Sequence, residues 1–223
     1  MFEGKKITVT GANGMIGKEL VRILKEEYSP KSVLEADLPI YDLRDRTDAA
    51  YVCDGQDIVF HLAGIKGSPQ RCMESPASFS VPMIQFNANM VEAAHHYDVE
   101  WFLYTSSVGV YHPADVFVED DVWKGFPSKL DWFGGWAKRM GELQAQAYEI
   151  QYKWDKISIV RPANVYGPYD NFDPANAMVI PSLINRATSG ERPLTVWGDG
   201  SPIRDFIYSE DVADGMLSVV QQG

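Results

Sequence analysis

Three glycines near the N-terminus, spaced three residues apart, carry the clearest chemical signal in this sequence. They stand at positions 11, 14 and 17 of the stretch TGANGMIG (residues 10–17), between an apolar run at 7–9 and a helical pattern. In such a turn the first glycine permits a tight strand-to-helix connection, the second lets the backbone approach a pyrophosphate, and the third lets the helix pack on the strand. The N–H groups of the helix N-terminus then face the phosphates. The pattern predicts a dinucleotide site; the alternative is a glycine-rich turn that binds nothing.

A carboxylate follows the next predicted strand at the point where a ribose would lie. Asp37 comes directly after the predicted strand 32–36 and twenty residues beyond Gly17. Such a carboxylate accepts hydrogen bonds from the two ribose hydroxyls, and it repels the 2′-phosphate of NADP. No arginine stands immediately after the strand to receive that phosphate. The sequence therefore favours NAD over NADP; the alternative is that Asp37 only caps a loop.

The elements that must position these groups alternate between helix and strand. The predicted helices, which carry an apolar face, cover residues 15–28, 76–97 and 135–152. The further predicted strands are short apolar runs at 57–63, 101–104 and 157–160. Continuous apolar strands are typical of a parallel sheet that is covered on both faces. The predicted fold class is therefore α/β, a doubly wound parallel sheet of the Rossmann type.

The alternation weakens beyond residue 162, where we place the substrate side. A loop at 166–170, a helical piece at 180–188 and a turn at 198–200 follow one another there. We expect residues 1–165 to form the dinucleotide-binding domain. Residues 166–223 are expected to form a partial C-terminal substrate lobe, with 203–220 returning to the first domain.

Charge and composition argue against several classes of partner. Acidic residues outnumber basic ones 31 to 20, so the surface field disfavours nucleic acid and anionic membranes. No apolar run reaches the roughly eighteen residues of a membrane span, and the chain opens on a strand rather than a signal peptide, which predicts a cytoplasmic protein. The two cysteines, Cys53 and Cys72, match no zinc spacing and are interpreted as buried or idle thiols. A small-molecule ligand, and no metal, is expected.

Six segments in a fixed order extend the interpretation. They are TGANGMIG (10–17), DLRD (42–45), HLAG (61–64), the stretch from TSS to the tyrosine at 105–111, RPANVYGP (161–168), and RDFI with DVA (204–213). Together they resemble the extended short-chain dehydrogenase/reductase family, in particular its NAD-dependent nucleotide-sugar epimerases and dehydratases. The resemblance covers nearly the whole chain. Residues 169–174 and 179–181 are most similar to the GDP-fucose synthases, which implies a GDP-linked sugar.

The resemblance implies roles for two side chains at the reaction centre. Ser107 lies four residues before Tyr111, where the family keeps a Ser or Thr whose hydroxyl binds the reacting sugar oxygen. Lys138 takes the place of the lysine in the family's Tyr-x-x-x-Lys motif. It would hold the nicotinamide ribose, and its charge would lower the pKa of a neighbouring acid. The alternatives are a Ser107 that only satisfies backbone groups at a strand end and a Lys138 that is a solvated helix residue.

The tyrosine of this motif is missing. Gly134 stands four residues before Lys138, so the phenolate that removes the sugar hydroxyl proton in the family is absent. Loss of a general base costs about 10²–10⁴-fold in rate. Three explanations stay open: another titratable group reaches the sugar, the chain has kept binding and lost its redox chemistry, or the residue was changed deliberately. The titratable residues nearest in sequence are Tyr104, Tyr111, His112 and Asp131.

Further departures from the family narrow the reaction. Dehydratases carry an Asp-Glu pair directly after the catalytic Thr, whereas Val108 and Gly109 follow Ser107 here, so water elimination lacks a proton donor. The cysteine and histidine that serve 3,5-epimerisation in GDP-fucose synthases correspond to Gly109 and Met178. The chemistry that remains is that of a 4-epimerase or a 4-keto reductase.

The resemblance also implies a set of ligand positions. Asn164 would contact the diphosphate of the nucleotide sugar, Arg204 would pair with its phosphates through the guanidinium fork, and Trp197 would stack on base or sugar unless it is buried. The substrate positions are Ser107, Asn164, Val179, Trp197 and Arg204. The cofactor positions are Gly11, Asn13, Gly14, Met15, Ile16, Gly17, Asp37, Asp42, Leu43, Leu62, Ala63, Gly64, Lys138 and Arg161.

Two readings of the whole chain follow, from different classes of protein. The first is an NAD-dependent nucleotide-sugar epimerase or reductase; the second is a catalytically impaired NAD and nucleotide-sugar binding protein with a regulatory or assembly role. A third, an NAD(P)-sensing regulator, is disfavoured because Asn164 and Arg204 are present. Family members dimerise through the two helices that flank the site, here 76–97 and 135–152, so a homodimer is expected. They also continue beyond the equivalent of residue 223, so we expect a substrate site that is only half walled.

Overall fold

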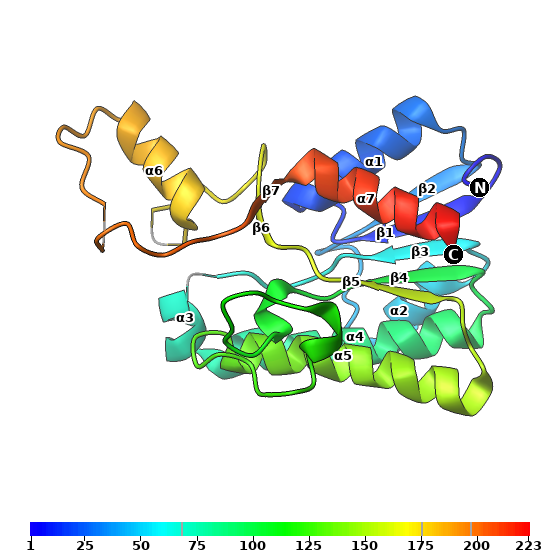
Figure 1. The fold of residues 1–223 in the computed structure, drawn as a ribbon. Coiled ribbons are helices and arrows are strands. Elements are labelled where there is room, and N and C mark those ends of the chain that lie inside the picture. The colour runs from blue at the N-terminus through cyan, green and yellow to red at the C-terminus, as the bar shows by residue number, and fades with distance from the viewer. Residues whose placement is uncertain (68, 175, 197) are drawn as a thin grey trace.

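Five parallel strands form the central sheet of the computed structural model, which describes residues 1–67, 69–174, 176–196 and 198–223, without the side chains of residues 69 and 70. The strand order is β2-β1-β3-β4-β5 (Figure 1). Their bounds are β1 (Lys6–Thr10), β2 (Ser32–Ala36), β3 (Ile58–His61), β4 (Trp101–Thr105) and β5 (Ile157–Val160). Because all five run in the same direction, their carboxyl ends meet at one edge, where ligands of such sheets bind.

Helices cover both faces of this sheet. On one face lie α1 (Met15–Glu27) and α7 (Ser209–Gln222); on the other lie α2 (Arg46–Cys53), α4 (Pro76–His96) and α5 (Trp132–Tyr152) (Figure 1). Between consecutive strands of this sheet the chain crosses back through helices that lie on both faces, which is the doubly wound arrangement. The predicted α/β fold of the Rossmann type is therefore confirmed.

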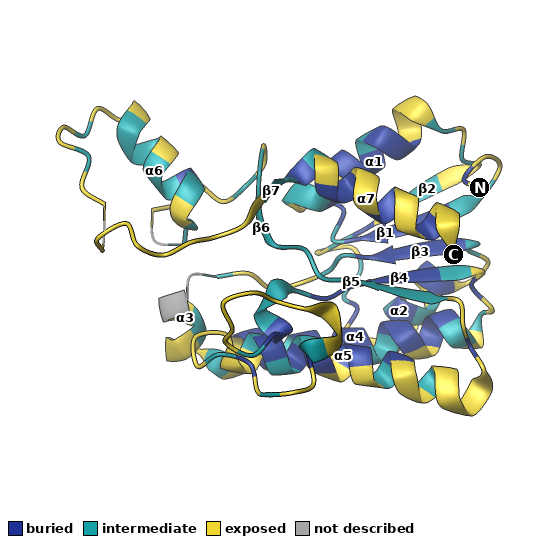
Figure 2. Ribbon diagram, viewed as in Figure 1, coloured by how far each residue is buried: buried dark blue, intermediate teal, exposed yellow. Residues whose placement is uncertain are grey.

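Alternation along the strands supplies two apolar cores. Neighbouring strand residues point to opposite faces, so Leu103 of β4 packs toward α1 and α7 whereas Phe102 and Tyr104 pack toward α2, α4 and α5. In β1, Ile7 and Val9 lie in the same core as Leu103. The buried side of each covering helix faces the sheet (Figure 2). The sheet is thus fixed from both sides, and its carboxyl edge is a rigid base for a site.

The C-terminal part of the chain leaves this layered body and then returns to it. A separate two-stranded parallel sheet pairs β6 (Asn164–Tyr166) with β7 (Phe206–Tyr208), and α6 (Val179–Thr188) stands apart from the central sheet (Figure 1). Helix α7 then packs along α1. Among the described residues, no helix is long and apolar enough to cross a membrane.

Six short elements were not predicted from the sequence. They are α2, α3 (Pro69–Glu74), the 3₁₀ turns η1 (Val108–Val110) and η2 (Glu119–Asp121), and the strands β6 and β7. Two predicted boundaries were also wrong. The strand expected over 57–63 ends at His61, because the next residues turn away to line a cavity. The helix expected from residue 135 begins at Trp132, because the carbonyl of Asp131 already accepts the first helical bond, from the Gly135 N–H at 2.6 Å.

Candidate functional site

The glycine-rich turn joins β1 to α1 with almost no room for side chains. Gly11 has a φ of +66°, and a Cβ there would lie 2.9 Å from the backbone nitrogen of Ala63. A Cβ at Gly17 would overlap the carbonyl oxygen of Gly11. Gly14 precedes α1 without a side-chain cap, so N–H groups of the first helical turn keep their capacity for an anion. The turn has the form that a pyrophosphate requires.

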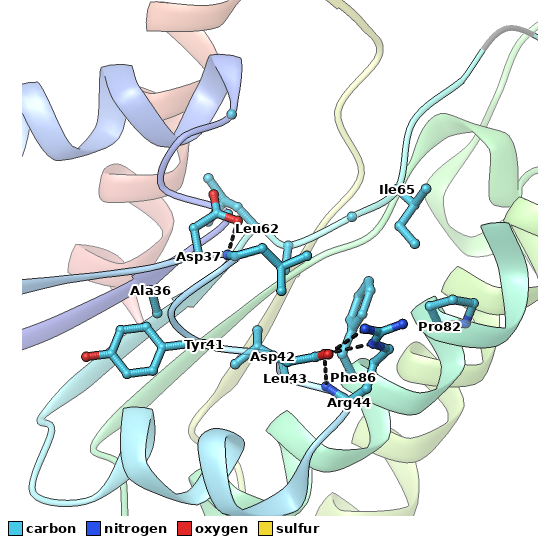
Figure 3. A pocket seen from close by; sticks show the side chains of 15 residues that line it. Ala36, Asp37, Tyr41, Asp42, Leu43, Arg44, Leu62, Ile65, Pro82 and Phe86 are labelled. Atoms are coloured by element: carbon cyan, nitrogen blue, oxygen red, sulfur yellow. Dashed lines mark hydrogen bonds and ion pairs between the residues drawn. The ribbon is translucent and has the colours of Figure 1, made fainter. Parts of the chain in front are cut away.

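A cavity of about 270 Å³ opens beside this turn at the carboxyl edge of the sheet (Figure 3). Asp37 stands in its wall, and its two carboxylate oxygens accept backbone N–H groups from Asn13 (2.9 Å) and Leu38 (2.8 Å). A carboxylate offers about four acceptor sites, so both oxygens can still accept a ribose hydroxyl. The lining residues are Gly11, Gly14, Ala36, Asp37, Leu38, Tyr41, Asp42, Leu43, Arg44, Leu62, Ala63, Gly64, Ile65, Pro82 and Phe86.

Arg44 is the arginine that lines this cavity, and its charge is bound to a neighbour. Its Nε donates to Asp42 at 2.7 Å, and a second nitrogen donates to the other oxygen of the same carboxylate (Figure 3). The hydrogen bonds from Arg44 hold the pKa of Asp42 below its usual value. Asn89 of α4 donates to the carbonyls of Leu43 and Arg44, 3.0 Å each, and so fixes the loop. A phosphate placed here would have to compete with Asp42.

The predicted cofactor positions fall into three groups in the structure. Eight line the cavity: Gly11, Gly14, Asp37, Asp42, Leu43, Leu62, Ala63 and Gly64. Four belong to the glycine turn and the start of α1: Asn13, Met15, Ile16 and Gly17. The remaining two, Lys138 and Arg161, lie outside the cavity wall and have different surroundings. An elongated dinucleotide fits the first two groups, because they combine an anion-binding turn with a ribose acceptor.

Lys138 extends from α5 toward Gly64, one of the residues that line the cavity. Its Nζ donates to the carbonyl of Thr105 at 2.8 Å, and a Cβ at Gly64 would lie 3.8 Å from it. Burial lowers the pKa of Lys138 to about 8. An ammonium group has three donors. After its bond to Thr105, Lys138 therefore keeps donors for a ligand that lies along Gly64.

Ser107 caps the η1 turn, two residues after the Thr105 carbonyl that Lys138 binds. Its Oγ accepts the Gly109 N–H at 3.1 Å, which leaves the hydroxyl hydrogen for another acceptor. Helix α5 packs directly on this turn, because a Cβ at Gly135 would overlap the carbonyl oxygen of Gly109. A Cβ at Gly134, by contrast, would meet nothing within 4 Å. The position where the resemblance calls for tyrosine is therefore open space, one helical turn before Lys138.

Of the four titratable residues named above, Tyr104 and Tyr111 have hydroxyls that are already bonded to other groups. Tyr104 is buried, its hydroxyl is bonded on both sides, and burial raises its pKa above the usual value. The hydroxyl of Tyr111 accepts from Arg161 at 3.3 Å, and its ring stacks on another aromatic ring. The Nδ1 of His112 is buried without a hydrogen-bond partner in the described part of the chain. Asp131 differs, because its side chain is exposed and lies beside Gly109.

Arg161 is held inside the protein by an ion pair. Its guanidinium donates to both carboxylate oxygens of Glu142, 2.9 Å each, and to the carbonyl of Glu119 at 3.2 Å. Glu142 is fully buried and also accepts from Ser106. The structure therefore places Arg161 in a network that ties β5, α5 and the loop after η1 together, and not at the cavity.

A chain of buried hydrogen bonds runs behind the site from the glycine turn to α5. The Ala63 N–H donates to Thr10 Oγ1 at 3.1 Å. The next member is the imidazole of His61, which lies 2.8 Å from Thr10 Oγ1 and 3.0 Å from the amide oxygen of Asn87. The hydrogen-bond chain continues from Asn87 Nδ2 to the Tyr104 hydroxyl at 3.0 Å and ends on the carbonyl of Lys138 at 3.1 Å. It thereby links the backbone at the cavity wall to the backbone of Lys138.

The direction of every bond in this chain follows from its last member. A carbonyl only accepts, so Tyr104 must donate to Lys138 and must itself accept from the amide nitrogen of Asn87. The amide oxygen of Asn87 then faces His61 Nε2, which must carry a proton. Burial lowers the pKa of His61 to about 3, so the ring is neutral and its Nδ1 accepts from Thr10. No local pattern in the sequence indicates these partners of His61.

The predicted substrate positions other than Ser107 lie in the C-terminal part of the chain. Asn164 donates to the carbonyl of Asp205 at 2.8 Å and joins β6 to β7. Arg204 is exposed and donates to the adjacent Ile203 carbonyl at 2.8 Å, while Val179 begins α6 with an exposed side chain. Trp197 lies outside the described residues. A second hollow of about 290 Å³ lies between these elements and is lined by Tyr166, Gly167, Pro168, Asp170, Phe172, Ile180, Pro181, Ile184 and Tyr208.

Comparison with known proteins gives one consistent family. Residues 7–223 match the model of the NAD dependent epimerase/dehydratase family. GDP-L-fucose synthase 1 of Arabidopsis thaliana is 30% identical over 97% of this chain and 69% of its own length. The dTDP-4-dehydro-6-deoxy-D-allose reductase of Streptomyces bikiniensis is 29% identical over 100% of this chain and 74% of its own. A solved GDP-L-fucose synthetase from Naegleria fowleri, bound to NADP, has a TM-score of 0.84 at 26% identity, over 97% of this chain and 73% of that one.

Proposed function

The chain belongs to the NAD-dependent epimerase/dehydratase family, and from this premise we propose that it is an NAD-dependent nucleotide-sugar 4-epimerase or 4-keto reductase whose substrate is a GDP-linked sugar. One observation carries the proposal. The half-buried ammonium of Lys138 lies near Gly64, in the wall of a cavity that begins at an anion-binding glycine turn, and it binds the Thr105 carbonyl two residues before Ser107, whose hydroxyl hydrogen is free. This arrangement suits a ligand that spans from a pyrophosphate to a reacting alcohol or ketone.

Each part of the site has a separate task in this reaction. When bound, the dinucleotide supplies an acceptor or donor of hydride. The glycine turn holds its pyrophosphate, Asp37 accepts from its adenosine ribose, and Lys138 donates to the ribose next to the nicotinamide. Ser107 donates to the sugar oxygen and fixes it for proton transfer. Asn164 and Arg204 hold the diphosphate of the sugar nucleotide from the other side, together with Val179.

The preference for NAD over NADP rests on charge. A 2′-phosphate would approach the Asp37 carboxylate, and the guanidinium of Arg44 is already paired with Asp42. The Naegleria fowleri protein was solved with NADP, so family membership alone does not select the cofactor. We therefore expect NADH to bind more tightly than NADPH.

The cofactor preference is tested by fluorescence titration of the protein with NADH and NADPH. We expect a lower Kd for NADH, by about tenfold or more, since a like charge close to the phosphate opposes binding. Asp37→Ser should weaken NADH binding and narrow the difference between the two cofactors. Asp54→Ser, which changes an exposed carboxylate after α2, is the control and should leave both values unchanged. Equal affinity of the unaltered protein for both cofactors would contradict the assignment.

A second candidate function is favoured by the open space at Gly134. Without a side chain there, the chain can hold NAD and a nucleotide sugar without turnover, as a regulatory or assembly subunit. The two functions separate in one experiment. The unaltered protein and the Gly134→Tyr variant are each incubated with NAD⁺ and GDP-mannose, UDP-glucose, UDP-galactose or dTDP-glucose, and the sugar products are identified by NMR. Turnover by the unaltered chain supports the enzyme. If both proteins bind NADH but neither forms a product, the result supports the binding subunit.

A further inference from the structure

One face of α5 makes three successive contacts with the segment from Thr105 to Gly109. Lys138 donates to the Thr105 carbonyl, and Gly135 touches the Gly109 carbonyl. Two turns before Lys138, the carboxylate of Asp131 lies against Gly109, so that a Cβ on Gly109 would stand 3.3 Å from its Cγ and Oδ1. Residues spaced three, four and seven apart share one helix face. Asp131 therefore lies on the same face as the Lys138 ammonium, with the open position 134 between them.

The two oxygens of this carboxylate have different surroundings. Oδ2 accepts from the Ser128 hydroxyl at 2.8 Å. Oδ1 faces Gly109 and has no hydrogen-bond partner within the part of the chain that the structure describes. Ser107 Oγ also contacts Gly109, through its N–H. An alcohol that entered the open space at 134 would thus meet a hydroxyl donor from Ser107 and a free carboxylate oxygen from Asp131.

We propose that Asp131 is the catalytic base and acid of this chain, in place of a side chain at position 134; the inference rests on the proposed function. In the oxidation direction, the O–H bond of the sugar breaks and its proton passes to Oδ1 of Asp131. The C–H bond at the same carbon breaks with its electron pair, which passes as hydride to the nicotinamide dinucleotide. A ketone is left, held by Ser107. In the reverse direction, Asp131 returns the proton to the oxygen as hydride returns to carbon.

The neighbouring thiol of Cys72 offers a probe of the Asp131 charge that needs no dinucleotide. Burial and, after it, the negative charge of Asp131 raise the pKa of this thiol. In Asp131→Asn the charge is removed, so Cys72 should form thiolate at lower pH and react faster with a disulfide reagent at pH 7.5. Cys53 is fully buried and its pKa is raised to about 12, so it contributes little to the reaction.

The decisive experiment compares four proteins: the unaltered chain, Asp131→Asn, Gly134→Tyr and the double variant. Each is mixed with NAD⁺ and each of the four sugar nucleotides named above, and NADH formation is followed by absorbance. Asp131→Asn should lower the rate about 10²–10⁴-fold. It keeps an oxygen for Ser128, so Tm and the Kd for NADH should stay unchanged. The double variant should recover to within about tenfold of Gly134→Tyr, because tyrosine supplies the base again.

Each other outcome has a defined meaning. A rate in Asp131→Asn equal to that of the unaltered chain overturns the role of Asp131 and leaves the proposed function intact. The same holds if Gly134→Tyr is active and the double variant is not, because Asp131 would then act on structure. Activity in Gly134→Tyr alone also overturns the proposal. If NADH binds and none of the four proteins turns over any sugar, the proposed enzymatic function itself fails.

Discussion

Lys138 carries its charge where water is largely excluded. Burial disfavours the ammonium form, and one carbonyl bond to Thr105 compensates only in part, so the pKa falls to about 8. The remaining donors have no fixed partner other than a ligand. At neutral pH the protein therefore holds a cation that is poised to bind ribose oxygens, and the price is stability in the free state.

This burial predicts opposite pH dependences for binding and for stability. The Kd for NADH should rise about tenfold between pH 7 and pH 9, as Lys138 loses its proton through pH 8. The free energy of unfolding should increase from pH 8 toward 10.5, because the native state binds fewer protons than the unfolded state in that window. Fluorescence titration measures the Kd for NADH, and urea unfolding measures the free energy of unfolding. Lys138→Met should flatten both curves, whereas Lys31→Met, at an exposed site, should leave both as they are. A Kd for NADH that is constant across pH 8 would contradict the role of Lys138.

At the scale of elements, the hydrogen-bond chain through His61 joins the parts that must agree on the position of the cofactor. It connects β1, β3, α4, β4 and α5 through Thr10, His61, Asn87, Tyr104 and Lys138. Thr10, His61, Asn87 and Tyr104 are buried, and each bonds to two groups in this network. Fully satisfied networks of this kind specify one arrangement of a core. These hydrogen bonds thus fix the distance between the cavity wall and the backbone of Lys138.

Breaking this network should destabilise the fold and weaken the cofactor site together. His61→Phe keeps a ring in place but leaves the hydroxyl hydrogen of Thr10 and the amide oxygen of Asn87 without their partner, at about 1–3 kcal/mol per buried group. We expect a loss of roughly 2–4 kcal/mol in the free energy of unfolding, measured in urea, and a weaker Kd for NADH. His96→Phe, at an exposed position on α4, is the matched control. A change below about 0.5 kcal/mol would show that the network is not required.

The partners within this network could not be predicted from the sequence, although most of the fold could. Apolar runs and their spacing predicted the five strands and the doubly wound fold, with α1 and every strand except β3 within a residue of their observed bounds, because periodicity is a local property. His61 and Asn87 are partners across 26 residues, and no local pattern reports such a pair. Helix α2 was missed because its sequence has no strong apolar periodicity.

The residues of the candidate site likewise fall into those that the sequence predicted and those that only the structure could assign. The glycine turn and Asp37 were predicted, since a turn with a ribose acceptor is encoded in adjacent residues. Arg161 was expected at the cofactor on the strength of its motif, but Glu142, fully buried on α5, binds its guanidinium. Asp131 was one of four equivalent candidates in sequence. Only burial and contacts, which depend on tertiary structure, distinguish it from the other three.

At the scale of the whole molecule, α4 and α5 leave an apolar surface uncovered next to the site. Val81 and Ile84 of α4 and Met140 and Leu143 of α5 are between 41 and 48% exposed. Each pair is three residues apart and so shares one helix face, and the two helices pack against each other. Apolar side chains grouped in this way mark an interaction surface. A second copy of the chain, related by a two-fold axis, would cover it with the same two helices.

We predict that the protein is a homodimer through this face, with sedimentation velocity at micromolar concentration as the measurement. A standard interface buries about 800 Å² per partner, which two helices of 21 residues each can supply. The double variant Ile84→Glu, Leu143→Glu would bury unpaired negative charges in this two-fold interface, so it should sediment as a monomer. Ile203→Glu, at a residue 91% exposed on the C-terminal side, should remain a dimer. If the unaltered chain sediments as a monomer, the helices that carry Lys138 and Asp131 are held by the packing of one chain alone. Turnover in dilute solution should then be independent of protein concentration, whereas a dimer would lose specific activity on dilution.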